Sequence, residues 1–161
     1  MTDTKKLINA RLSVLIGLDL SGINHAADML TLQFGPVRET TTRRGTIKRV
    51  GTWALHVQCN WQIEQTGAAI ARRDNLYGSD EAAQLAIERL EESLVRSRAT
   101  TVEGIAGSEY GAVCISMSGG LCLVITPDGG LEDEDWRFFA PGVDASHLVI
   151  EGGKVDPDSL S

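Results

Sequence analysis

The sequence predicts an α+β fold, mainly antiparallel sheet, with one clear helix at about residues 80–97. The sheet is indicated by residues 53–64, where apolar and polar side chains alternate without a break. A strand with one buried and one wet face is typical of antiparallel sheet. We expect either one long strand here or two shorter ones that meet near Asn60. The helix is indicated by an apolar stripe that begins after a cap at Ser79 or Asp80. The stripe consists of Ala83, Ile87, Leu90 and Leu94.

Shorter elements complete the predicted fold. Strands are expected at residues 17–25, 30–34, 101–106, 111–117, 120–126 and 146–150. The first two form a hairpin with its turn near Ala27 and Asp28, and glycines at 119 and 120 supply a tight turn in a later meander. A short helix at 3–13 and a helical turn at 131–136 are also expected.

The length suits a single α+β domain over residues 1–150. Residues 151–161 lack apolar periodicity, so we expect a flexible C-terminal tail. Two β-rich stretches, at about 15–64 and 100–150, follow a similar order of hairpin and tryptophan-containing strand. This echo is consistent with an internal duplication, and the alternative is that hairpins in general look alike.

The charge balance bears on the partners of the chain. Fifteen basic and 22 acidic residues give a net charge of −7, which argues against nucleic acid as a partner. No stretch reaches the roughly 18 uncharged apolar residues of a membrane span. Two early lysines precede an apolar run that polar residues interrupt, unlike a signal peptide. We therefore expect a cytoplasmic protein.

The cysteines and histidines show no spacing typical of a metal or redox site. Cys59 occupies the apolar phase of its strand and is expected to be buried and inert. Cys114 and Cys122 flank a turn that can bring them close across a hairpin. We nevertheless expect free thiols there because nothing else indicates an oxidising compartment. His25, His56 and His147 are far apart in sequence, with His56 best placed on a polar strand face.

Motifs for a nucleophile elbow, a phosphate loop and a dinucleotide site are missing from the sequence. We therefore predict no catalytic residue, no metal and no cofactor.

Two charged segments are candidates for contact with a partner. Residues 38–52 are basic and are best explained as a solvated hairpin with Gly45 at its turn. Four carboxylates lie beside an aromatic side chain and are predicted to form an acidic partner-binding surface with an aromatic anchor. These residues are Glu132, Asp133, Glu134, Asp135 and Trp136. The alternative is the start of a helical turn, where the helix dipole favours acids, and the two interpretations are compatible.

Three segments carry a resemblance to a known family. They are AADMLTLQFG at 26–35, ALHVQCNW at 54–61, and WRFF at 136–139 with Pro141 and Gly142. With them the chain resembles a family of small uncharacterised bacterial proteins, from Leu15 to Ile150, although Asn60-Trp61-Gln62 departs from the Pro-Trp-Arg associated with that family. The family implies no assigned chemistry. In general character the chain is similar to immunity proteins of bacterial toxin systems, which implies direct binding to a toxin domain.

Three functional hypotheses follow. The first is a small acidic binding protein, in particular an immunity protein, whose charge complements a basic protein partner. The second is a homo-oligomeric structural module, such as a homodimer, in which exposed Trp and Phe side chains are buried. The third is an enzyme or small-ligand protein with a site among His56, Gln58, Cys59 and the basic loop. The sequence favours the first because it needs no catalytic constellation.

Overall fold

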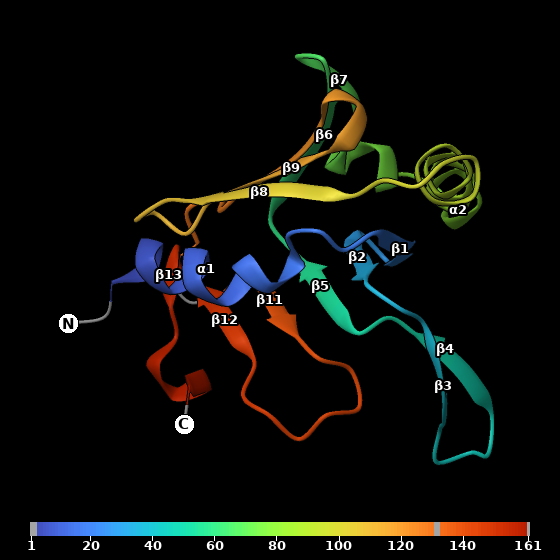
Figure 1. Cartoon of the computed structure of the whole chain (residues 1–161). Helices are drawn as coiled ribbons and strands as arrows, with labels where there is room; N and C mark the ends of the chain where they lie inside the picture. The colour runs from blue at the N-terminus through green and yellow to red at the C-terminus, as the bar shows by residue number, and fades with distance from the viewer. Residues whose placement is uncertain (1–2, 131–132, 161) are drawn as a thin grey trace.

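Two antiparallel sheets form the two layers of the computed structural model, which describes residues 3–130 and 133–160 (Figure 1). The six-stranded sheet contains, in spatial order, β1 (Leu20–Ala26), β2 (Met29–Phe34), β5 (Trp53–Val57), β11 (Glu134–Phe139), β12 (Leu148–Glu151) and β13 (Lys154–Val155). The five-stranded sheet contains β7 (Ala68–Arg72), β6 (Asn60–Gln65), β10 (Leu121–Thr126), β9 (Val113–Met117) and β8 (Val102–Gly107). β3 (Arg38–Thr41) and β4 (Ile47–Val50) form a separate hairpin. The predicted α+β fold with mainly antiparallel sheet is confirmed.

The alternating segment at 53–64 forms two strands in different sheets. β5 lies in the six-stranded sheet and β6 in the five-stranded sheet. At the break, the backbone N–H groups of Gln58 and Cys59 both donate to the carbonyl of Asp135, at 2.8 and 3.1 Å. The alternation continues through the break because the apolar side chains of both strands enter one shared core.

Two helices cover the open sides of the layers. α2 (Asp80–Glu91) begins at Ser79, whose Oγ accepts the N–H of Ala82 at 3.1 Å, and continues as a π-helical turn to Arg96. It packs against β1. α1 (Thr4–Leu12) packs against β8 and β13. Both predicted helices and the turn at Ala27 and Asp28 are confirmed. Among the described residues, no helix is long and apolar enough to cross a membrane.

The helical turn expected at 131–136 is wrong for its described part. Residues from Glu134 onward form β11, because Trp136 and Phe138 alternate into the core. Leu131 and Glu132 lie outside the described residues. The burial of these aromatic rings outweighs the weak preference of acids for a helix start.

The flexible tail expected at 151–161 is also wrong for the residues next to β12. β13 pairs with β12, and Val155 is buried beside α1, where its N–H donates to Oγ1 of Thr4 at 3.3 Å. One buried apolar side chain and the pairing with β12 hold this segment in place. A strand of two residues is too short to show a hydrophobic periodicity in the sequence. The internal duplication remains a prediction.

Candidate functional site

The predicted acidic surface is divided between the exterior and the core. Asp133 is exposed, and Glu134 accepts hydrogen bonds from Arg137, with Nη2 at 2.5 Å and Nε at 3.3 Å. Asp135 and Trp136 are only 1% and 0% exposed. Glu132 lies outside the described residues. A shift of the strand register between Glu134 and Trp136 turns both Asp135 and Trp136 inward, so these two cannot belong to an exposed surface.

Asp135 and Trp136 instead hold two surface turns together. The Asp135 carboxylate accepts the N–H of Gly153 at 2.8 Å, and Nε1 of Trp136 donates to the carbonyl of Gly111 at 2.7 Å. Burial raises the pKa of Asp135, and the bond from Gly153 lowers it in part. Both glycines have positive φ and lie so close that a Cβ on Gly111 would be 2.7 Å from the Gly153 backbone. The strand that carries the acidic segment therefore positions the β8–β9 and β12–β13 turns side by side.

An acidic cleft lies where these turns meet the start of α1. It encloses about 810 Å3 and is lined by Asp3, Thr4, Glu109, Glu151, Lys154, Val155, Asp156 and Pro157. Figure 1 shows α1 beside β13 at this end of the molecule. Four carboxylates face one lysine, so the lining is strongly negative. Glu109 and Glu151 form no ion pair with any other described residue.

An exposed aromatic side chain stands next to this cleft. Tyr110 follows Glu109 and is 82% exposed. Its turn is fixed by Oγ of Ser108, which accepts the N–H groups of Tyr110 and Ala112 at 3.2 and 3.1 Å. The carbonyl of Asp133 accepts the N–H of Gly152 at 3.1 Å, so the predicted acidic segment reaches the same end of the molecule. Sequence reasoning missed the cleft because its acids come from separate segments without a common local pattern.

Two of the three histidines meet on the outer face of the six-stranded sheet. The rings of His56 and His147 lie 4.8 and 4.5 Å from the ring of Phe139, edge-on and stacked respectively. Nη1 of Arg137 lies 3.0 Å from Nδ1 of His147, and this geometry requires a neutral ring that accepts the bond there. Burial, with a smaller effect of the Arg137 charge, lowers the pKa of both histidines. His25 lies elsewhere, 3.1 Å from Oε1 of Gln84.

The proposed site at His56 is only partly assembled. Gln58 joins the cluster by donating from Nε2 to Glu134 at 3.1 Å, and the charge of Lys48 in the basic hairpin helps to lower the pKa of His56. Cys59 is buried in the core, and burial raises the pKa of its thiol to about 12, so it is not a nucleophile. Within the described ranges, no group of three or more His, Cys, Asp and Glu is placed to hold a metal ion.

The basic segment forms the solvated hairpin predicted from its sequence. β3 and β4 are largely exposed, and Gly45 lies in the turn between them with positive φ. Arg38 donates from Nη2 to the carbonyl of Pro141, which ties the hairpin to the loop after β11.

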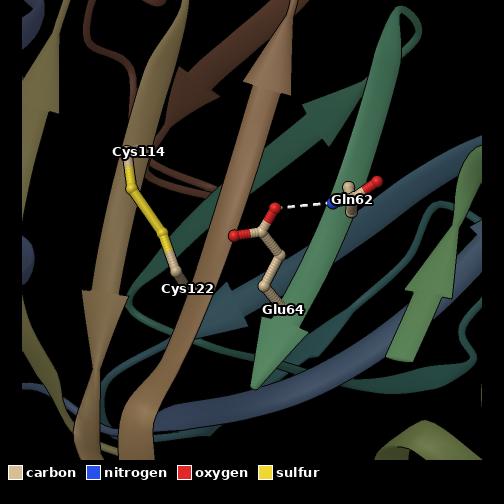
Figure 2. Close-up of a disulfide and its surroundings, with 4 residues drawn as sticks. All are labelled: Gln62, Glu64, Cys114 and Cys122. Atoms are coloured by element: carbon tan, nitrogen blue, oxygen red, sulfur yellow. Dashed lines mark hydrogen bonds between the residues drawn. A yellow bond between two sulfur atoms is a disulfide. The ribbon is translucent and has the colours of Figure 1, made fainter. Parts of the chain in front are cut away.

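Cys114 and Cys122 form a disulfide between β9 and β10, so the expectation of free thiols is wrong for this pair (Figure 2). The register places Cys114 opposite Val124 and Cys122 opposite Ser116, so the two side chains are diagonal neighbours on the outer sheet face. Their Cα atoms are 6.5 Å apart. Figure 2 also shows the hydrogen bond from Gln62 to Glu64, 2.5 Å long, on the adjacent β6. The proximity across a hairpin agrees with the sequence, and only the bond itself was not expected.

Comparisons with protein-family models, with curated proteins and with solved structures matched nothing to this chain.

Proposed function

We propose that this protein is a binding protein whose acidic cleft docks onto a cationic surface of a protein partner. The observation that carries the proposal is the convergence of Asp3, Glu109, Glu151 and Asp156 on one cavity, with the exposed Tyr110 directly after Glu109 in the chain. Carboxylates without an ion pair attract a cationic surface over a distance and speed association.

Tyr110 is the proposed anchor in place of Trp136. Tyrosine is enriched among the residues that contribute most to interface affinity, because its large ring buries apolar area while its hydroxyl remains hydrogen-bonded. The turn that carries Tyr110 is fixed by hydrogen bonds to Ser108. A preorganised turn loses little conformational entropy on binding, which favours a tight complex.

An immunity protein that covers a cationic toxin domain is the specific form of the proposal suggested by the sequence resemblance. We propose the cytoplasm as the place of action. Thiols there are kept reduced, so the Cys114–Cys122 bond provides a check on that location. Trapping free thiols with an alkylating agent at lysis tests that location, because a Cys114–Cys122 bond found intact in the cell would contradict the cytoplasm and favour an oxidising compartment.

The oligomeric hypothesis receives less support. It requires exposed Trp and Phe side chains, yet Trp61, Trp136, Phe34 and Phe138 are buried in the core of the chain itself. Trp53 and Phe139 are half-buried and stack on Phe138 and His147.

The test is site-specific photo-crosslinking in the cells that make the protein. A benzophenone amino acid replaces Tyr110 in one variant and Ile47 in a control, because Ile47 is 65% exposed on the distant β3–β4 hairpin. We expect one basic protein to crosslink from position 110 and not from position 47. The purified partner should then bind the parent protein in solution, and a toxin should harm cells only when this protein is absent.

A partner that crosslinks equally from both positions would contradict the proposal. So would a crosslinked protein that, once purified, binds the parent and the variant E109Q/E151Q with the same affinity.

A further inference from the structure

A second cavity, of about 320 Å3, lies between α2 and the edge strand β7 of the five-stranded sheet. We call it the helix–sheet groove. Its apolar lining includes Trp61, Ile70, Leu76, Ala86, Ile87 and Leu90. Trp61, Leu76 and Ile87 are buried, whereas Ile70 is 44% exposed.

The sequence of β7 explains why the groove is open. Three of the five residues of β7 are alanine, and these small side chains leave space beneath α2. The pairing with β6 places Ala69 opposite Glu64 and Ala71 opposite Ile63, so Ile70 is an extra residue at a bulge. The bulge leaves the side chain of Ile70 as an apolar wall of the groove rather than part of the core.

Arg89 gives the groove a cationic rim. It is exposed, lines the cavity, and forms no ion pair with any other described residue. The nearby acids Glu91 and Glu92 are instead paired with Arg96, at 3.9 and 3.2 Å. Ser93 and Asn75 add polar groups to the lining. The groove thus combines an apolar interior with one free guanidinium group.

Trp61, which lines the groove, carries a buried donor without a partner among the described residues. Its Nε1 is buried and has no acceptor among the described residues. Buried donors without partners are rare in folded proteins. A ligand oxygen that reached this donor would gain a hydrogen bond.

We propose that the helix–sheet groove binds an amphipathic monocarboxylate, with its aliphatic or aromatic body among the apolar side chains and its carboxylate on Arg89. Guanidinium and carboxylate groups match in geometry and form charge-assisted hydrogen bonds. The apolar walls disfavour sugars, and a single arginine beside Glu88 and Glu92 disfavours polyanions. The volume is at the lower end of the range for small-molecule sites. None of the residues of the acidic cleft takes part, so this site is independent of the proposed partner.

The experiment titrates the full-length protein with octanoate and with octan-1-ol, a chain of equal length without the charge. Binding is followed by calorimetry and by 15N chemical shifts. The variants are R89Q, A86W, which fills the groove, and R49Q, a matched loss of charge on the exposed β4 strand. The 15N shifts of the parent locate the site even where A86W fails to fold.

We expect octanoate to shift the amides of β7 and α2. R89Q should weaken octanoate binding about tenfold or more, the loss expected for a charge-assisted hydrogen bond, and leave octan-1-ol unaffected. A86W should abolish the binding of both octanoate and octan-1-ol, whereas R49Q should bind both ligands as the parent does. The proposal is overturned when octanoate does not bind, when its shifts map elsewhere, or when R89Q binds octanoate as the parent does.

Discussion

Replacement of Trp136 by phenylalanine tests the buried link between β11 and the turn before β9. Trp136 is fully buried, and its Nε1 donates to the carbonyl of Gly111 at 2.7 Å. Phenylalanine fits the same strand but removes the donor and part of the ring. The turn that carries Tyr110 should then be held less firmly.

The cost follows from two contributions. Leaving the buried Gly111 carbonyl without its donor costs about 1–3 kcal/mol. The smaller ring loses the burial of about two methylene equivalents, at about 0.8 kcal/mol each. We therefore expect W136F to lower the free energy of unfolding by about 3–5 kcal/mol.

The assay is urea unfolding at pH 7, with W53F as the matched control. Trp53 is half-buried and stacks on Phe138 at 5.1 Å, a contact that phenylalanine can keep. W53F should cost about 1 kcal/mol or less. Equal and small losses for the two variants would refute the burial and the hydrogen bond assigned to Trp136.

Four further predictions concern titratable groups and cysteines. The pKa of both His56 and His147 is lowered from 6.5, so the unfolded chain binds more protons than the folded protein, and stability should fall as the pH drops below 6.5. The urea midpoint should therefore decrease from pH 7.5 to pH 5.5, and this decrease should be smaller in H56Q/H147Q than in the parent. The pKa of Asp135 is raised from 3.8, so its ionised form opposes folding. D135N should therefore have a higher urea midpoint than the parent at pH 7, and the difference should vanish below pH 3.8. A lower midpoint of D135N at pH 7 would contradict the assignment. The disulfide between Cys114 and Cys122, which are eight residues apart in sequence, should stabilise the fold by up to about 2.5 kcal/mol relative to C114S/C122S. Cys59 should resist thiol reagents until the protein unfolds, and rapid labelling of Cys59 in the folded protein would show that it is accessible.

Elements with a local signal could be predicted from the sequence. The stripe on α2, the hairpin of β1 and β2 and the meander of β8, β9 and β10 depend on spacing and turn residues that lie within each element. The division of 53–64 between two sheets depends instead on the carbonyl of Asp135, which binds Gln58 and Cys59 from far along the chain. Local alternation gives no information on that contact.

The candidate site shows the same limit more strongly. The four adjacent acids Glu132 to Asp135 predict one surface, yet β11 begins only at Glu134 and leaves that side chain half-buried while it turns Asp135 into the core. The acidic cleft gathers Asp3, Glu109 and Glu151 through the docking of α1 and two turns. In the sequence, the negative net charge is the one feature consistent with this acidic cleft.

The central claim is tested most directly by the rate of association with the crosslinked partner, measured at low and high salt. The parent is compared with E109Q/E151Q in the cleft and with E39Q/E103Q, which removes the same charge from exposed positions on β3 and β8. We predict that the cleft variant associates more slowly and with a weaker salt dependence, while the control matches the parent. Equal rates and equal salt dependence for all three proteins would contradict binding through the acidic cleft.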